Sequence, residues 1–328
     1  MKLPTAIVLM IFSSTLVFSE TWNLNKFQFT MENDADFNTD YSYTHGGRIS
    51  LLFSRENLNN DSITIPLLDP QNKNHLISFA YANQMYVPYD RKSLEIVEDD
   101  RPYAGWSYIE LGLHQNSSTQ LDSLTLQLGI VGPSAGMEDL QNEIHKYLDA
   151  KHSHGWHNQL EDEISIQLNY MHKWRFKYQD IYGLNSVLVP YSGVNLGNVS
   201  TKLSGGALYS IGWNIPNSFG VNSMNEGSFA SIPVDSKIEN SNVMSIYFNF
   251  LAGVNLVAKD IFVDGNTFKD SHSVERYPAN AYIGAGLSIR LKSFTINYWH
   301  QNYTKDYRER GKYKPYQGYG SLLLEYNF

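Results

Sequence analysis

Polar and apolar residues alternate with a period of two along several segments of the chain. The clearest lies at 164–174, where isoleucine, leucine and aromatic residues form one face and serine, glutamine, asparagine and lysine the other. Apolar faces of the same kind recur at 124–130, at 281–291 and from Phe294. Side chains that alternate in this way predict β-strands. Strands of roughly ten residues have the length that a tilted membrane crossing requires.

The number and arrangement of these strands predict a closed barrel. The last strand, Leu322–Phe328, places Phe328 and alternate residues before it on one face. A sheet in lipid cannot have an edge of unpaired backbone groups, so it must close on itself. We therefore predict an all-β fold, a transmembrane antiparallel up-and-down β-barrel of about 12 strands. The remaining strands are expected to begin near Phe27, Arg48, Ile77, Ser107, Val187, Leu203 and Ile246.

One segment has helical spacing instead. Residues 136–149 follow the breaker Gly132-Pro133 and carry apolar residues three and four positions apart. This spacing predicts a short helix beside the barrel wall or mouth. On it, Gln141 and His145 are four residues apart and share one face.

Polar, turn-rich stretches between the strands are predicted to be loops. They lie at 56–61, 214–240 and 264–272, and the second is long enough to be an extracellular loop. The scattered acids of 260–270 are interpreted as a solvated loop. No internal repeat or linker divides the chain.

The N-terminus predicts export. Lys2 is the only charge before Glu20, and a short apolar run, 6–12, lies between them. This pattern is typical of a signal peptide, which we place at 1–19, followed by one barrel domain at 20–328. No later segment has the roughly 20 apolar residues of a membrane helix. An ordinary N-terminal core helix is the alternative.

Composition narrows the chemistry. The formal net charge of −8 disfavours nucleic-acid binding, for which a basic patch is expected. The absence of cysteine excludes disulfides and thiolate chemistry. Aromatic residues make up 14% of the chain, as suits a barrel with interfacial aromatic girdles.

Oxygen-bearing side chains gather after the first predicted strand. Glu32, Asn33 and Asp34 are followed by Asp36 and Asp40. Carboxylate and amide oxygens are ligands of Ca²⁺, but the same residue types also form ordinary polar turns. The spacing does not match an EF-hand. A calcium site and a polar hairpin loop are therefore both open interpretations here.

His145 is the candidate for acid–base chemistry, and Gln141 is placed to orient its ring. A purely structural histidine is the alternative. The Gly-x-Ser-x-Gly elbow of a serine hydrolase and the His-Glu-x-x-His zinc motif are both absent from the sequence. Three basic residues, Arg91, Lys92 and Arg101, are candidate phosphate contacts or solvated loop charges.

Six short motifs follow one another through roughly the first half of the chain. In this order they resemble the family of outer-membrane lipid A 3'-O-deacylases, whereas the second half matches only as a generic barrel. The motifs are Glu32-Asn33-Asp34, Tyr43-Thr44-x-Gly46, Asp100-Arg101-Pro-Tyr-Ala-Gly-Trp106, Gly129-x-Val-Gly-Pro133, Gln141-Asn-x-x-His145 and Gly155-Trp156-x-Asn-Gln159.

The resemblance implies a twelve-stranded barrel with a calcium-dependent esterase site between the lipid-facing wall and the outer mouth. It implies catalysis by His145, with Asn33, Asp34 and Thr44 nearby and Gln141 on the same helix. It also implies lipid A or lipopolysaccharide as the partner, in the bacterial outer membrane. The loop between 86 and 100 is shorter than in some members, so the family's lysine falls on Lys92 or Arg91. We expect a monomer.

A mechanism follows as a hypothesis. Neutral His145 takes a proton from a water molecule that attacks the ester carbonyl. Ca²⁺, held by Asp34 with Asn33 and neighbouring oxygens, stabilises the developing oxyanion. Water is then the direct nucleophile, and no acyl-enzyme forms. The alternatives are an outer-membrane phospholipase, a porin or adhesin barrel without enzymatic activity, and a soluble secreted β-protein.

Overall fold

The computed structural model describes most of the barrel but leaves parts of the chain out. The predicted signal peptide at 1–19 and the predicted loop at 56–61 lie outside the described residues and stay predictions. The described residues are 22–34, 41–55, 74–149, 152–181, 183–221, 224, 231–234, 244–308 and 316–328.

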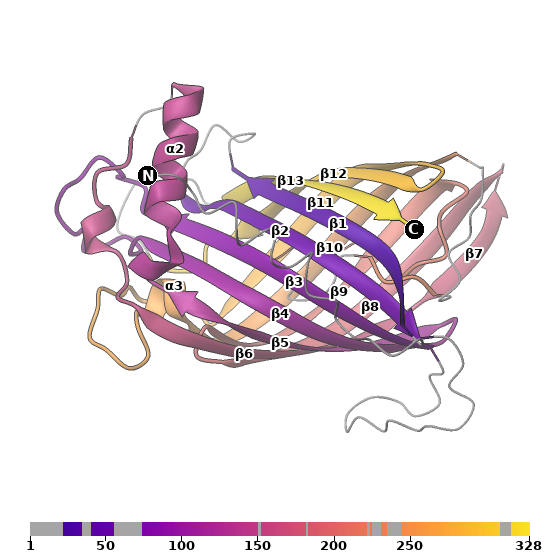
Figure 1. Ribbon diagram of the computed structural model, residues 1–328, viewed down its shortest axis with the longest axis horizontal. Helices are drawn as coiled ribbons and strands as arrows, with labels where there is room; N and C mark the ends of the chain where they lie inside the picture. Colours follow the sequence, from indigo (N-terminus) through magenta and orange to yellow (C-terminus); the bar gives the residue numbers. More distant parts are fainter. Residues whose placement is uncertain are drawn as a thin grey trace.

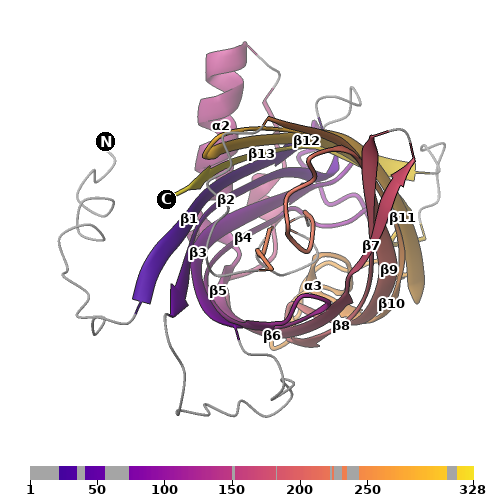
Figure 2. The same ribbon diagram turned by 90° about the vertical axis from the view of Figure 1, so that its right-hand side faces the viewer.

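All strands belong to one antiparallel sheet that closes on itself (Figures 1 and 2). The sheet runs through neighbouring strands from β6 to β1, passes to β13 and returns to β8, which pairs with β6. The strands are β1 (Trp22–Asn33), β2 (Ser42–Arg55), β3 (Asn74–Val87), β4 (Ala104–Asn116), β5 (Gln120–Val131), β6 (Glu163–Trp174), β7 (Phe176–Ile181), β8 (Leu184–Gly197), β9 (Ser200–Trp213), β10 (Ser245–Asp260), β11 (Ala279–Leu291), β12 (Phe294–Thr304) and β13 (Tyr316–Asn327).

The predicted antiparallel barrel and its strand number are confirmed. β7 follows β6 after a single residue, Arg175, and pairs with the same partner, β8. The two therefore act as one staggered strand, and the 13 segments form a closed barrel of twelve strands. Every expected strand is present.

The barrel has its apolar residues outside and its polar residues inside. In β6, Ile164 is 72% exposed, whereas the next residue, Ser165, is fully buried. Several buried charges in the lumen are paired, as in Arg48–Glu110 at 2.5 Å and Lys26–Glu325 at 2.9 Å. An apolar outer face is stable against lipid and unfavourable in water, so the alternation identifies a barrel that spans a membrane.

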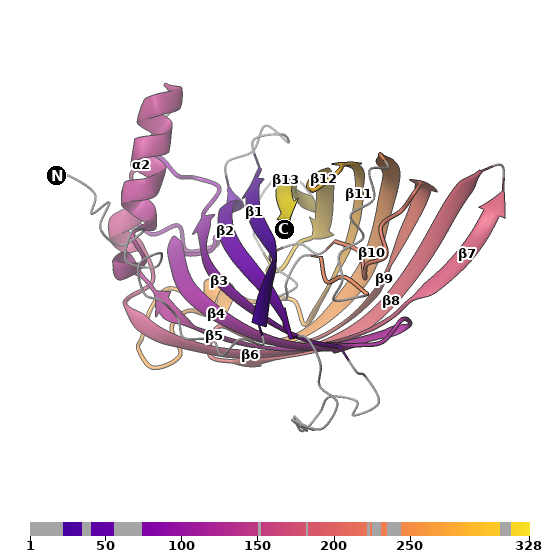
Figure 3. The same cartoon turned by 45° about the vertical axis from the view of Figure 1, so that its right-hand side comes forward.

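The two ends of the barrel differ. The chain enters β1 and leaves β13 at one end, and the connection that carries helix α2 (Met137–Leu148) lies at the other (Figures 1 and 3). The connections 88–103, 132–162 and 261–278 all lie at the α2 end. Connections of more than ten residues are more numerous at the α2 end than at the other end. Longer loops are typical of the extracellular side of bacterial barrels, so we assign the α2 end to the outer mouth. Among the described residues, no helix is long and apolar enough to cross a membrane.

The predicted helix is confirmed within one residue at each end. α2 begins after Gly136, which adopts a left-handed conformation (φ 76°), and ends before Asp149. A short 3-10 helix, Pro133–Ala135, precedes it. The loop expected at 264–272 is also present, but the solvated loop predicted from 260 is correct only in part. Its first residues form the short helix α3 (Ile261–Asp264), which buries three apolar side chains.

The prediction that 214–240 forms an extracellular loop is wrong. This connection leaves β9 and enters β10 at the end opposite α2, and its described residues turn into the barrel (Figure 2). We call the described residues 214–221, 224 and 231–234 the plug segment. Phe219, Ile232 and Val234 pack there against luminal leucines of β2, β3 and β5. A polar, turn-rich composition is compatible with either end of a barrel, so the sequence alone does not place this connection.

Side chains of the wall hold the plug segment by its backbone carbonyls. Arg175 Nε donates to Ser218 O at 3.0 Å, and Asn116 Nδ2 donates to Pro233 O at 2.7 Å. Lys26 Nζ donates to Ser231 O at 3.2 Å. These bonds satisfy buried polar groups on both partners, which favours an occupied lumen over an open one.

This occupied lumen predicts that the protein does not behave as a porin. In planar lipid bilayers we expect only small and infrequent conductance steps, because the plug segment and paired polar side chains fill the cross-section. The double variant Arg175→Ala, Asn116→Ala removes two tethers and should increase the frequency of the steps. Stable porin-sized channels from the parental protein would contradict the prediction and favour a transport function.

Candidate active site

The end of β1 and the start of β2 bring together three of the predicted site residues. Asn33 Nδ2 donates to the carbonyl of Thr44 at 2.9 Å, and the amide of Asp34 donates to the same oxygen at 3.4 Å. Asp34 in turn accepts a hydrogen bond from the amide of Tyr41 at 3.0 Å. The side chains of Asp34 and Thr44 are buried. The turn therefore forms a compact cluster of oxygen-bearing groups.

Thr44 is the extra residue of a β-bulge. Along β2, Tyr43 lies opposite Tyr86 of β3 and His45 lies opposite the preceding residue, Met85, so that Thr44 has no partner. A bulge bends the strand and redirects a side chain, and bulges are over-represented next to active sites. No feature of the sequence predicted this irregularity.

The cluster suits a hard cation. Thr44 Oγ1 is buried without a hydrogen-bond partner, which marks an oxygen that is available to a ligand. The carboxylate of Asp34 and the amide oxygen of Asn33 are further oxygen donors of the kind that Ca²⁺ prefers, with water or substrate completing its coordination. Within the described ranges, no group of three or more His, Cys, Asp or Glu is arranged for a metal ion. Asp36 and Asp40 lie outside those ranges.

Helix α2 provides a second cluster. Gln141 and His145 are both buried, whereas Glu143 and Lys146 between and beside them are exposed, so the predicted shared face is confirmed. The indole N–H of Trp156 donates to Gln141 Oε1 at 2.7 Å. Trp156 lies in one of the motifs but was not a predicted site residue. It fixes the carboxamide beside His145, and an orienting role of Gln141 for the His145 ring stays a prediction.

α2 sits on the outer face of the barrel wall. Trp106 lines the lumen, so alternation along β4 points Gly105 outward. Met137 of α2 covers this glycine so closely that a Cβ there would lie 2.7 Å from Met137 Cγ. Beneath the helix, an apolar cluster holds it in place. This cluster consists of Met85, Val87, Tyr103, Ala135, Met137 and Trp156.

The loop 88–103 connects the two clusters. The carbonyl of Arg91 accepts hydrogen bonds from Tyr103 Oη at 2.9 Å and from the amide of His154 at 2.8 Å. The Tyr103 ring lies 5.0 Å from that of Trp156. Partial burial lowers the pKa of the Arg91 guanidinium, and the negative charge of Asp34 opposes this shift. The structure thus places Arg91 within the electrostatic influence of the β1–β2 cluster.

The other two basic candidates have different surroundings. Lys92 is exposed on the same loop, where it is accessible to a ligand. Arg101 is only 1% exposed and pairs with Asp306 at 2.7 Å. Its guanidinium also donates to Ser42 Oγ at 2.7 Å and lies over the Tyr86 ring. These contacts occupy Arg101 inside the mouth, so its placement favours a structural role over the expected phosphate contact.

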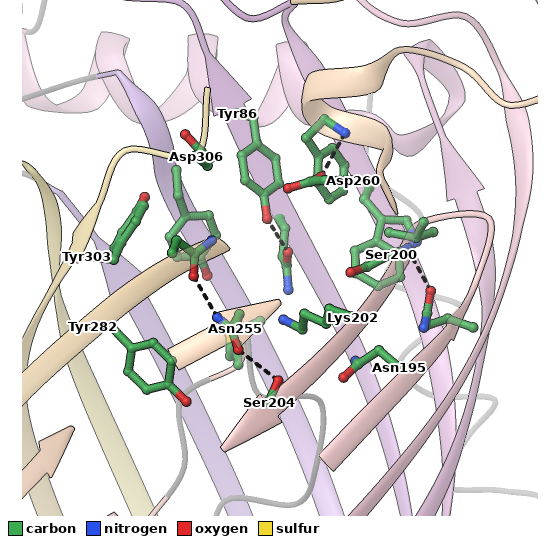
Figure 4. A pocket seen from close by; sticks show the side chains of 18 of the residues that line it. Tyr86, Asn195, Ser200, Lys202, Ser204, Asn255, Asp260, Tyr282, Tyr303 and Asp306 are labelled. Atoms are coloured by element: carbon green, nitrogen blue, oxygen red, sulfur yellow. Dashed lines mark hydrogen bonds between the residues drawn. The ribbon is translucent and has the colours of Figure 1, made fainter. Parts of the chain in front are cut away.

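A cavity of about 130 Å³ lies in the lumen and is lined by none of the predicted site residues. Figure 4 shows polar side chains such as Lys202, Asn255 and Asp306 around it, with Asp260 and Tyr86 toward the mouth. The polar side chains among the aromatic ones of its lining give water molecules hydrogen-bond partners. The Asn33 side chain and helix α2 lie on the other side of the wall from this cavity, since alternation directs Asn33 outward from the luminal Glu32 and α2 lies outside.

Fold and site together define an outer-membrane β-barrel with a polar site on the outer face of its wall, near the mouth. The family model of the outer membrane protein LpxR matches residues 4–328, and the chain therefore belongs to the LpxR family. This is the deacylase family that the six motifs resemble, and membership supports an outer-membrane lipid A deacylase.

One solved structure supports the fold, and a second is less similar. LpxR from Salmonella typhimurium superposes with a TM-score of 0.71 at 18% identity, over 92% of this chain and 100% of that chain. The β-domain of the Bordetella autotransporter BrkA gives a TM-score of 0.44 at 7% identity, over 94% of this chain and 98% of that chain. No curated protein matches the chain by sequence.

Proposed function

We propose that this protein is a calcium-dependent lipid A 3'-O-deacylase that hydrolyses the ester of the 3'-linked acyloxyacyl chain and so remodels lipopolysaccharide. One observation carries the proposal. A buried histidine on a helix seated against the outer wall shares a face and an end of the barrel with the oxygen cluster of Asn33, Asp34 and Thr44. Esters of an outer-leaflet lipid lie at this depth, outside the lumen.

The reaction needs a base, a water molecule and stabilisation of negative charge. His145 acts as the general base that takes the proton of water as its oxygen attacks the ester carbonyl, and it returns a proton to the leaving sugar hydroxyl. Trp156 holds Gln141 beside it. Asp34, Asn33 and Thr44 would hold Ca²⁺, which when bound supplies Lewis-acid stabilisation of the developing oxyanion. The Asn33 and Asp34 donors to the Thr44 carbonyl keep these oxygens in place.

The surroundings of the site suit an amphipathic lipid. Exposed apolar residues such as Met31 and Ile49 cover the outer face of β1 and β2, where acyl chains can lie. Lys92 and Arg91, on the loop between the clusters, are basic residues that would contact the phosphates of the head group. An apolar wall with basic groups at its rim matches lipid A, which carries acyl chains below and phosphates above.

Mass spectrometry of lipid A incubated with the purified protein tests this proposal. With Ca²⁺ we expect loss of the mass of the 3'-linked acyloxyacyl group, and with chelator no loss, because the oxygen cluster would lack its cation. Loss from another position would correct the regiospecificity. Fatty acid released only from phospholipid would favour a phospholipase, and no release from either lipid would favour a barrel without enzymatic activity.

A further inference from the structure

We propose that Glu32 and Tyr43 form a luminal clamp that positions the β1–β2 turn for catalysis. Both are positioning residues, since they act through Asn33, Asp34 and Thr44 and not on the substrate. The expected effects on kcat rest on the proposed function. The hydrogen bonds of the clamp do not depend on which reaction the protein catalyses.

The buried carboxylate of Glu32 accepts hydrogen bonds from β2, from β13 and from the plug segment. Its Oε2 accepts a hydrogen bond from Tyr43 Oη at 2.7 Å, and its Oε1 accepts one from the amide of Met224 at 3.0 Å. Ser321 Oγ of β13 donates to the same Oε1 at 3.3 Å. Glu32 is fully buried. A carboxylate in this position ties β1 to β2, to β13 and to the plug segment, and each bond to its charged oxygens is stronger than a neutral one.

Gly46 makes the clamp possible. It lies opposite Glu32 in the register of β1 and β2. A Cβ on Gly46 would lie 2.0 Å from Tyr43 Oη, so a side chain there would occupy the place of the phenol. Tyr43 crosses over this glycine to reach the carboxylate. The contact gives a physical reason for the spacing of Tyr43 and Gly46: the glycine opposite Glu32 leaves room for the phenol of the tyrosine three residues before it.

The clamp and the proposed catalytic contacts hold the same turn from opposite sides. Asn33 and Thr44, the residues next to Glu32 and Tyr43, are joined by their own hydrogen bond. The bulge leaves Thr44 without a partner in β3. The backbone of a bulged residue has more conformational freedom than that of a residue in a regular hydrogen-bonded ladder. The position of Thr44 therefore depends on the residues beside it. The Tyr43 ring is fixed in turn by Tyr319, at 5.1 Å in an edge-to-face contact.

Tyr43→Phe tests the clamp, because it removes one hydroxyl and keeps the ring. We expect kcat for lipid A to fall on the order of 10- to 100-fold, since small displacements of catalytic groups have effects of this size. We expect KM to stay within about twofold, because the lipid-facing surface is unchanged. Glu32→Gln keeps an acceptor oxygen and should retain more activity than Glu32→Met, which has a similar volume but no acceptor oxygen, so a purely space-filling role would not explain the difference.

Tyr191→Phe is the matched control. Tyr191 is also buried in the lumen, and its hydroxyl bonds to that of Tyr282 of β11. It should leave kcat unchanged. Heat-modified electrophoretic mobility reports for each variant whether the barrel has assembled. Parental kcat in Tyr43→Phe, or an equal loss in Tyr191→Phe, would overturn the clamp.

Hydrogen–deuterium exchange separates failure of the clamp from failure of the proposed function. Peptides that cover the described strand ends 28–34 and 41–48 should exchange faster in Tyr43→Phe than in the parental protein, and at the parental rate in Tyr191→Phe. If the parental protein releases no acyl group from lipid A, the proposed function fails while this measurement still decides the clamp. Unchanged exchange in Tyr43→Phe would overturn the clamp whatever the activity.

Discussion

Replacing His145 with alanine is expected to reduce acyl release from lipid A by at least about 100-fold, the contribution typical of a general base. The residue lies on the buried face of α2, next to the Gln141 carboxamide that Trp156 holds. The helix is anchored by Met137 and the apolar cluster beneath it, which the substitution does not touch. The barrel should therefore assemble normally, and the rate should be measured by mass spectrometry of the released product.

His152→Ala is the control for this prediction. The ring of His152 lies 6.4 Å from that of His145, but its side chain is exposed. If His145 is the base, removal of this neighbouring imidazole should change the rate by less than about tenfold, well below the loss of a general base. Near-parental activity in His145→Ala, or equal losses in both variants, would show that the catalytic base is elsewhere.

Arg101→Leu is expected to have the largest effect on stability. The guanidinium pairs with Asp306 and bonds to Ser42, and it is buried between the aromatic rings of Tyr86 and Tyr307. Removing one partner of a buried ion pair leaves the other charge uncompensated, which costs about 3–5 kcal/mol. Urea unfolding in detergent, followed by the loss of heat-modified mobility, measures this change in the free energy of unfolding.

Lys92→Leu is the matched substitution that tests the alternative role of a basic residue, contact with a phosphate of lipid A. Lys92 is exposed, so its loss should change the stability by less than about 0.5 kcal/mol, as is usual for surface positions. If it contacts a phosphate of lipid A, KM should rise. A variant of Arg101 that unfolds like the parental protein but binds lipid A weakly would contradict the structural role and restore the predicted phosphate contact.

The sequence by itself determined the barrel and the helix. Strand alternation has a period of two, and a membrane barrel shows it on every strand, because one side of the wall faces lipid and the other the lumen. The helix at 137–148 was predicted to within a residue because its apolar spacing differs from that of the flanking strands. The same helical spacing predicted that Gln141 and His145, four residues apart, lie on one face of the helix. These features depend only on neighbours in the chain.

The sequence also contained the motifs of the site, but it did not show which of their residues are in contact. Glu32 and Tyr43 were recognised as parts of two motifs, but their bond crosses two strands and depends on the register that places Gly46 between them. Trp156 was likewise recognised in a motif, and its bond to Gln141 spans 15 residues of chain. Strand register and the path of the loops determine which motif residues are in contact. A local sequence pattern encodes neither of them.

Only the tertiary structure decided the surroundings of the charged residues and the path of the connection between β9 and β10. Arg101 and Lys92 are equivalent in sequence as basic loop residues, but one is enclosed by Asp306 and aromatic rings while the other is solvated. The connection between β9 and β10 has the composition of a surface loop, but its described residues, the plug segment, turn into the barrel, where Phe219 and Ile232 pack against luminal leucines. Burial is a property of the assembled molecule. It depends on contacts between segments far apart in the chain, and for that reason composition alone did not reveal it.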